Sequence, residues 1–411
     1  MFREWVLFLY SVNYLLAPAI TYLFESGQIR YGMKVSQEYY FTLAFPGMMF
    51  FAIGMYLVPT RLFQPSLGKI NRTSVINEQF LVRLTFLGIV LKLVSSSIPG
   101  ELSFFLYLIS LIRFVGAFSL FSVNAQKYWL FTFLVLSIEI FSGFLRGMYH
   151  DAIMWLIFFA LYFTYFRKPS FQIKIIGLSS LIIFVLFIQS IKGVYRSQVW
   201  SGERDASIGT IADISTDIAS SDDVTNEKNL LSTLNRANQA WIFASTIDRM
   251  DRYGDFQGMT NVNLYLEAAL LPRFLAPNKI KSGGESGRSI FNQFSGHELQ
   301  EGTSMGLGIF ADGYIAYGAS GVFIFGFTLG LIFSLVFMLI EGWTKISAFY
   351  VFFLLPILNY AVRPDCELQT TINHIAKGII IYGFLVYLTK KRFVISSPDS
   401  NRKLEHLKFT R

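Results

Sequence analysis

Charged residues are scarce in this sequence, and it has only one cysteine. Asp, Glu, Lys and Arg make up 15% of its 411 residues, whereas about 25% are charged in an ordinary soluble domain. Because 53% of the residues are hydrophobic and 43 are phenylalanine, a soluble globular protein is excluded. The single cysteine, Cys366, excludes an internal disulfide and a metal site built from several cysteines. We therefore expect an all-α polytopic membrane protein.

Long apolar runs predict about ten transmembrane helices. Runs of about 17 to 22 apolar residues match the length that an α-helix needs to cross a hydrocarbon core of about 30 Å. The predicted spans are 5–24, 40–58, 80–98, 102–123, 128–145, 152–166, 173–191, 319–340, 346–362 and 375–388. The first apolar run is too long for a signal peptide, so we interpret it as an uncleaved span.

The lysines and arginines of the short connections predict the orientation. With the N-terminus in the cytoplasm, the cytoplasmic connections and tail hold 16 of these residues and the opposite short connections hold 4. Because positive residues favour the cytoplasmic side, both termini are predicted to be cytoplasmic. The chain then divides into four parts: a seven-helix membrane region at 1–191, an extracytoplasmic (periplasmic) loop domain at 192–318, a three-helix membrane region at 319–389 and a basic cytoplasmic tail at 390–411.

The formal net charge of +8 does not indicate a nucleic-acid partner. The long segment 192–318 holds 11 Lys and Arg against 15 Asp and Glu, and the rest of the chain holds 24 against 12. The basic excess therefore belongs to the membrane part and not to a water-facing domain. We expect no binding of nucleic acid.

Three charged residues, Lys92, Arg113 and Glu139, fall inside predicted spans. A charge that faces lipid costs at least about 2.5 to 3.5 kcal/mol, so each should point into the protein or into a wet cavity. The structural interpretation is an interior ion pair between Arg113 and Glu139. The functional alternative is that these residues line a substrate cavity.

The long segment contains two stretches with helical character. From Thr225 or Asn226, apolar residues follow helical spacing as far as Ile247, which predicts an amphipathic helix. The next apolar stretch, 263–276, is too short to cross a membrane and contains Pro272. It is expected to lie at the membrane surface or to re-enter shallowly.

Cations among glycines and amides in this segment suggest a phosphate-binding site. Such cations, next to backbone N–H groups that can turn toward a ligand, suit a phosphate or diphosphate group. A plain flexible turn explains the spacing equally well. The candidates for a diphosphate site are Arg236, Arg273 and Arg288, with Lys279 and Arg196 as weaker ones.

The stretch 296–321 combines many glycines with an apolar, aromatic run that holds one acid, Asp312. Glycines allow a ligand or a second helix to approach the backbone closely, and helix packing is the simpler explanation for Gly318 and Gly321. His297 stands near the start of the stretch. No second His or Cys lies close enough in sequence to suggest a metal site. No cofactor is expected.

The layout and three stretches resemble the Wzy-type O-antigen and exopolysaccharide repeat-unit polymerases. The stretches are NRANQAWI (235–242), LLPRFLAPNK (270–279) and GTSMGLGIFADGYIAYGASG (302–321), and the shared layout is many Phe-rich spans with one large loop late in the chain. The resemblance implies a fold like that of the GT-C glycosyltransferases. It also implies an enzyme that joins polyprenyl-diphosphate-linked oligosaccharides at the outer face of the bacterial cytoplasmic (inner) membrane.

In such a metal-independent glycosyltransferase, arginines would hold the leaving diphosphate and a base would activate the acceptor hydroxyl. His297 is the first candidate for that base because a histidine titrates near neutral pH without tuning. Asp312 is the second candidate, followed by Glu298 and Glu301, because a carboxylate needs burial to act at that pH. A solvated loop histidine is the alternative for His297. The implied partners are lipid-linked oligosaccharides, membrane lipids, a chain-length regulator and other polysaccharide-assembly proteins.

Three other functions fit parts of the pattern. O-antigen ligases share the layout and have a loop histidine ahead of a GxxG element, which His297 and residues 318–321 resemble. A lipid-linked oligosaccharide flippase or transporter would also be polytopic, but would normally show two similar halves. A membrane scaffold or sensor would require no loop arginine for chemistry.

Overall fold

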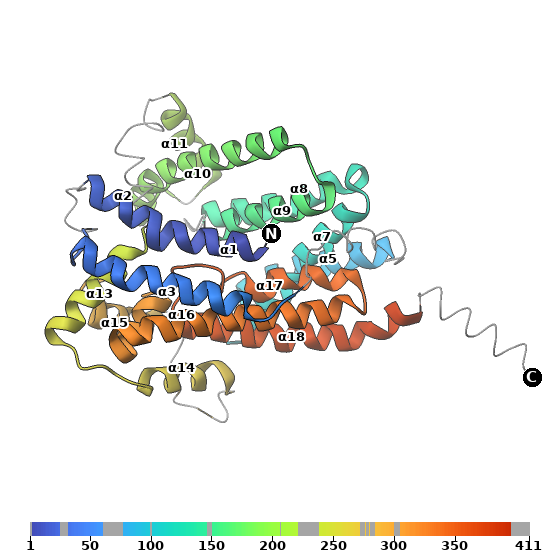
Figure 1. Ribbon diagram of the computed structural model, residues 1–411. Helices are drawn as coiled ribbons and strands as arrows, with labels where there is room; N and C mark the ends of the chain where they lie inside the picture. The colour runs from blue at the N-terminus through green and yellow to red at the C-terminus, as the bar shows by residue number, and fades with distance from the viewer. Residues whose placement is uncertain are drawn as a thin grey trace, which may run out of the picture. The chain divides into compact units, whose positions relative to one another are not determined.

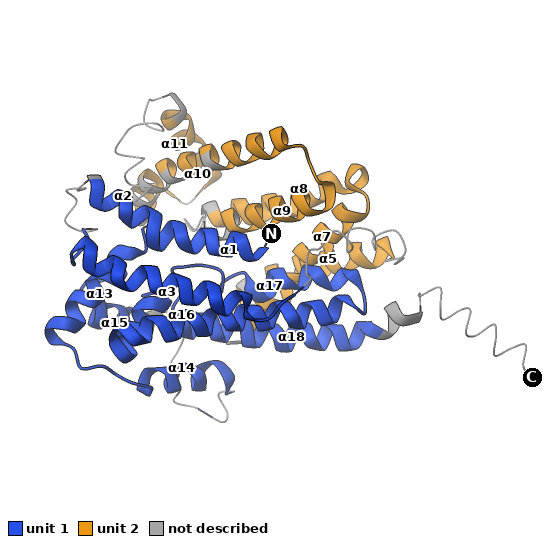
Figure 2. Ribbon diagram, viewed as in Figure 1, with its two compact units in different colours: residues 1–67, 235–411 blue, residues 68–234 orange. Residues whose placement is uncertain are grey.

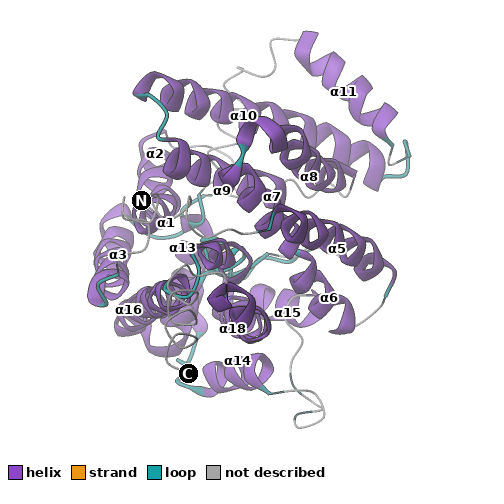
Figure 3. Cartoon of the chain, turned by 90° about the vertical axis from the view of Figure 1, so that its right-hand side faces the viewer, coloured by secondary structure: helices purple, strands orange, loops and turns teal. Residues whose placement is uncertain are grey.

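The computed structural model describes residues 2–24, 32–60, 77–98, 101–145, 150–205, 207–220, 238–271, 276, 279, 284–299 and 305–395 (Figure 1). These residues form helices and loops, without a strand among them (Figure 3). The all-α class expected from the composition is therefore confirmed.

Six helical stretches within the described residues are long and apolar enough to cross a membrane. They are Phe2–Leu23, Gln37–Leu57, Leu102–Val123, Phe171–Ile188, Ile309–Thr344 and Leu368–Lys390. The protein is thus a membrane protein with several spanning helices, and the number ten stays a prediction.

The chain forms two compact units, one of residues 1–67 and 235–411 and one of residues 68–234 (Figure 2). The helices of the second unit are α5 (Glu78–Ser97), α6 (Glu101–Ser110), α7 (Ile112–Val123), α8 (Ala125–Leu145), α9 (His150–Arg167), α10 (Phe171–Trp200) and α11 (Ile208–Ser220). All five spans predicted between residues 80 and 191 lie on these helices. The last of them, α10, continues to Trp200, nine residues past the predicted end at 191.

The second unit contains the buried charges that the sequence placed inside spans. The Arg113 guanidinium lies 2.5 Å from the Glu139 carboxylate, and both side chains are almost fully buried. The Lys92 ammonium lies 4.0 Å from the same carboxylate. The predicted pair of Arg113 with Glu139 is confirmed. A buried ion pair of this kind keeps both charges away from lipid.

The first unit contains the N-terminal and C-terminal parts of the chain, including the long element α16. Its helices are α1 (Phe2–Ser11), the π-helical turn η1 (Val12–Leu16), α2 (Ala17–Phe24), α3 (Gln37–Leu57), α13 (Ala240–Tyr253), α14 (Thr260–Leu270), α15 (Gly284–Ser295), α16 (Ile309–Thr344), the 3-10 helix η4 (Ala348–Phe353), α17 (Leu354–Leu358) and α18 (Leu368–Ile395). In Figure 1, α3 and α16 run side by side, and their contacts are extensive.

Glycines bring α3 and α16 into close contact. A Cβ on Gly54 would collide with the backbone of Phe327, and a Cβ on Gly330 would collide with the backbone of Phe51. Gly326 lies four residues before Gly330 and packs on the opposite helix in the same way. This is the small-residue spacing that allows two membrane helices to approach closely, so glycine content here serves helix packing.

The element α16 is a helical hairpin, not a straight helix. Tyr317 and Gly318 have non-helical backbone angles, and Gly318 has a φ of 59°. Residues 313 and 321 would be about 12 Å apart in a straight helix. Instead, a Cβ on Gly321 would collide with the Gly313 carbonyl oxygen. The chain therefore reverses direction at 317–318, and a short first arm (309–316) packs on a long second arm (319–344), which begins where the sequence placed the eighth span.

The predicted ninth span is not one helix. Residues 346–362 form the 3-10 helix η4, the five-residue α17 and turns, all of them largely buried. After these turns, the chain passes through residues 363–367 and enters α18. The connection 363–367 lies against Gly306 and Gly308, just before the first arm of the hairpin.

Candidate functional site

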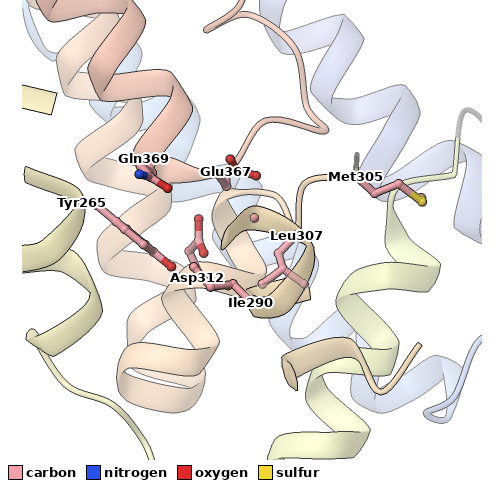
Figure 4. Close-up of a pocket in the computed structure, with 8 residues that line it drawn as sticks. Tyr265, Ile290, Met305, Leu307, Asp312, Glu367 and Gln369 are labelled. Atoms are coloured by element: carbon pink, nitrogen blue, oxygen red, sulfur yellow. The ribbon is translucent and has the colours of Figure 1, made fainter. Parts of the chain in front are cut away.

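A pocket lies between the start of α18 and the first arm of α16 (Figure 4). Eight residues line it: Tyr265, Gly287, Ile290, Met305, Leu307, Asp312, Glu367 and Gln369. It holds about 250 Å³ of empty space, some of it open to solvent. The part of this space that a water molecule can enter is only about 10 Å³. A cavity needs about 10 to 15 Å³ of this kind to hold one water molecule, so the pocket has room for a hydroxyl-sized group and not for a sugar ring.

Asp312 lies in the pocket wall and joins the two helices. It belongs to the first turns of α16, and its side chain is only 5% exposed. Its Oδ2 accepts a hydrogen bond of 2.7 Å from the backbone N–H of Leu368, the first residue of α18. The carboxylate therefore caps a second helix, where the backbone N–H groups have no partner within their own helix. The acid predicted from the sequence is thus buried and held in a defined position.

Two groups of hydrogen bonds hold in place the hairpin arm that carries Asp312. At its far end, the backbone N–H groups of Gln257 and Gly258 donate to the carbonyl oxygens of Ile315 and Ala316. On its side, the Tyr314 hydroxyl donates to the Asp251 carboxylate and lies 2.9 Å from the hydroxyl of Tyr39 on α3. The arm is therefore fixed to both α13 and α3.

Glu367 is a second carboxyl group of the pocket. Its Oε1 accepts a hydrogen bond of 2.7 Å from the Thr370 hydroxyl one turn into α18. Burial raises the pKa of the Glu367 carboxyl, and the negative charge of Asp365 adds to this shift. Glu367 thus keeps its proton at a higher pH than an exposed glutamate does.

Two glycines just before α16 lie close to the connection 363–367. A Cβ on Gly306 would lie 2.9 Å from the Glu367 Oε2 and would collide with the Asp365 carbonyl oxygen. Gly308 has a φ of 85°, and a Cβ there would collide with the Tyr14 hydroxyl. The glycine-rich stretch predicted to allow close backbone approach does so here, between the hairpin and the connection 363–367.

Tyr265 and Gln369 complete the polar side of the pocket. Figure 4 shows the hydroxyl of Tyr265 and the amide of Gln369 next to the Asp312 carboxylate. Tyr265 on α14 is 3% exposed, and burial raises the pKa of its hydroxyl, with smaller effects from the charges of Asp312 and Glu367. Gln369 is 2% exposed, and its amide nitrogen has no hydrogen-bond partner. A buried donor without a partner is unfavourable, so this group is suited to a ligand.

His297, the other predicted base, is not among the residues that line this pocket. Its Nε2 lies 3.2 Å from the Ser245 hydroxyl, and its ring packs edge-on against Trp241 at 5.2 Å between ring centres. Both neighbours belong to α13. The histidine is therefore packed against a helix and partly buried, not a fully solvated loop residue.

Most of the predicted diphosphate site lies outside the described residues. This holds for Arg236, Arg273 and the side chain of Arg196. Lys279 is described, and its ammonium donates to the carbonyl oxygens of Ala268 and Leu271 at the end of α14, where a cation caps the helix. Arg288 is partly buried on α15, directly after Gly287 of the pocket wall.

The amphipathic helix predicted from Thr225 is described only in its second half. That half is α13, whose first two turns are buried on all sides. Gln239, the residue before the helix, is also buried and donates to the Gly306 carbonyl oxygen. The predicted apolar stretch 263–276 contains most of α14, which packs on α18.

Comparisons with known proteins give a family and no function. No curated protein and no solved structure matches the chain. A family described as a domain of unknown function (DUF8712) matches residues 19–345, which include Tyr265 and Asp312 but not Glu367 and Gln369. Because the match covers well over half of the sequence, the chain belongs to the DUF8712 family.

Proposed function

We propose that this protein is a polysaccharide polymerase that joins polyprenyl-diphosphate-linked oligosaccharide repeat units. The product would be an O-antigen, a capsule or a secreted polysaccharide. The proposed location is the bacterial inner membrane, with both termini in the cytoplasm and the reaction at the outer face. The proposed architecture has ten spans and resembles that of GT-C glycosyltransferases. The first support is the resemblance in layout and in the stretches 235–242, 270–279 and 302–321.

The observation that carries the proposal is the position and surroundings of Asp312. It is a buried acid in a pocket on the reversing arm of a membrane hairpin, and its carboxylate is anchored by one backbone N–H. The described residues that line the pocket include two carboxyl groups and no lysine or arginine. These lining residues offer a phosphate group no cation to pair with, whereas a hydroxyl group can donate to a carboxyl oxygen. The pocket therefore suits the acceptor hydroxyl and not the donor diphosphate.

The proposed reaction transfers one glycosyl group between two lipid-linked molecules. A terminal sugar hydroxyl of the acceptor attacks the anomeric carbon of the donor, and the bond between that carbon and the diphosphate oxygen breaks. The hydroxyl proton passes to Asp312, or to His297 as the second candidate. The polyprenyl diphosphate leaves as an anion, held by arginines of the long segment, for which Arg236, Arg273 and Arg288 are the candidates.

The lipid-linked species that accumulates after gene deletion tests this function. A polymerase predicts outward-facing single repeat units on polyprenyl diphosphate, and these disappear when the wild-type gene is restored. Retention of finished polymer on lipid would indicate a ligase, and accumulation of single units on the cytoplasmic face would indicate a flippase. Either of these results contradicts the proposal.

A further inference from the structure

The pocket contains polar groups that acid–base chemistry at Asp312 does not use. Glu367 and Gln369 belong to the start of α18, whereas Asp312 comes from the first arm of α16. Glu367 has one oxygen bonded to Thr370, and its other oxygen faces the backbone of Gly306. The amide nitrogen of Gln369 has no partner, although the side chain is almost completely buried. A single proton-accepting group would not require these two residues.

These groups together can both accept and donate hydrogen bonds. Carboxylates accept, and an amide offers two N–H donors and one acceptor oxygen. A hydroxyl group donates one hydrogen bond and accepts up to two, so it can satisfy a carboxylate and an amide at once. The apolar part of the lining is formed by Ile290, Met305 and Leu307.

A cation fits these groups less well. Divalent cations such as Mg²⁺ and Ca²⁺ take about six to eight oxygen ligands. Within the described residues no group of three His, Cys, Asp or Glu side chains is placed to hold a metal ion. The Asp312 Oδ2 is also already bonded to a backbone N–H.

We propose that Glu367 and Gln369 bind a second hydroxyl group of the acceptor sugar, next to the hydroxyl that Asp312 activates. The pocket then selects the acceptor by two neighbouring hydroxyls on one ring, and Tyr265 closes the site beside Asp312. This inference rests on the proposed polymerase function. It assigns Glu367 and Gln369 a role in acceptor specificity, whereas Asp312 acts on the reacting atom.

Two synthetic acceptors test the proposal with full-length protein in lipid nanodiscs. One is the repeat oligosaccharide, and the other is the same molecule without the hydroxyl next to the linkage position. Losing one buried hydrogen-bonding partner should reduce kcat/KM with the deoxygenated acceptor about tenfold to a hundredfold in the wild-type protein. In Gln369→Leu this preference should largely disappear, because the full acceptor loses the same bond. The change should lie mainly in the KM for the full acceptor and less in kcat.

A matched variant separates this role from a general effect of the substitution. Gln293→Leu changes the same residue type at an exposed position of α15 and should keep the wild-type preference. If the wild-type protein forms polymer but uses both acceptors equally, or if Gln369→Leu keeps the full preference, the specificity role is wrong and the polymerase function stands. If the wild-type protein forms no polymer, the proposed function itself fails.

A second measurement needs no variant. A hydrophobic carbodiimide modifies protonated buried carboxyl groups, and mass spectrometry of the wild-type protein reports the modification of Glu367. The free repeat oligosaccharide should protect Glu367, whereas the same oligosaccharide after periodate cleavage of its neighbouring hydroxyls should not. Equal protection by both, or protection by Mg²⁺ or Ca²⁺ alone, would overturn the assignment.

Discussion

At the scale of single residues, Asp312 and His297 are the two candidate bases and they have different surroundings. Asp312 lines the pocket and caps α18, whereas His297 packs on α13 through Ser245 and Trp241. A correctly positioned general base raises the rate of a reaction by a factor of about 10² to 10⁴. We therefore expect Asp312→Asn to lower polymer formation about a hundredfold or more, and His297→Ala to lower it much less.

Asparagine is the suitable replacement because its side-chain oxygen can still accept from the Leu368 N–H. Polymer length and rate are measured on gels with purified lipid-linked repeat units at equal protein levels. A near-normal rate for Asp312→Asn together with an inactive His297→Ala would assign the base to the histidine instead.

The raised pKa of the Glu367 carboxyl predicts that the stability of the protein depends on pH. Burial raises its pKa above the ordinary value of about 4.5, so the folded protein binds this proton more tightly than the unfolded chain. The stabilising contribution is complete below the unfolded pKa and is lost as the pH rises through the folded pKa. The thermal unfolding midpoint should therefore fall as the pH rises above about 4.5, and Glu367→Gln should reduce this fall.

The matched control is Glu203→Gln, since Glu203 is exposed in the second unit. It should keep the wild-type pH profile of the unfolding midpoint in detergent. A Glu367→Gln profile identical to that of the wild-type protein would show that this carboxyl does not titrate with folding.

The sequence indicated one acid of the pocket and missed its other polar residues for a physical reason. Asp312 stands alone in an apolar, aromatic run, where an unpaired acid is costly. Glu367 and Gln369 follow it by more than 50 residues and lie in a short connection with ordinary polar composition. The only available signal was the predicted topology, which placed this connection on the same side as the long segment 192–318.

At the scale of elements, the reversal of α16 is the feature that positions the site. The two arms touch at Gly313 and Gly321, where a Cβ would collide with backbone that cannot rotate away. Overpacking of this kind typically lowers the free energy of unfolding by about 1 to 3 kcal/mol. We expect Gly321→Ala to lower the unfolding midpoint and also to reduce activity, because it displaces the arm that carries Asp312.

Gly342→Ala on the second arm is the control, since a Cβ at that glycine meets no neighbour. It should leave both the unfolding midpoint and the polymer yield unchanged. Wild-type stability and activity for Gly321→Ala would mean that the two arms do not pack as described.

Hydrophobic periodicity could predict the long second arm of α16 but not the hairpin. Residues 309–344 form one apolar run, and a reversal inside such a run leaves the composition unchanged. The local signal was the GASG sequence at 318–321, which we assigned to helix packing. That assignment was right for Gly321, whereas Gly318 supplies the positive φ of the turn. The same limit applies to 346–362, where an apolar run forms two short helices.

At the scale of the whole molecule, the membrane topology has to place the long segment 192–318 and the connection 363–367 on one side of the membrane. The distribution of 16 against 4 lysines and arginines predicts this arrangement. A reporter fused after Asp223 should be extracytoplasmic, and one fused after Arg402 should be cytoplasmic. Reporters on the same side of the membrane would contradict the ten-span arrangement.

The central proposal is that the protein joins lipid-linked repeat units without a metal ion. The most direct test incubates the purified protein in nanodiscs with polyprenyl-diphosphate-linked repeat units in the presence of EDTA. We predict a ladder of lipid-linked polymers whose lengths differ by one repeat, together with release of polyprenyl diphosphate. Unchanged single units, in a preparation whose unfolding midpoint shows that the protein is folded, would contradict this account.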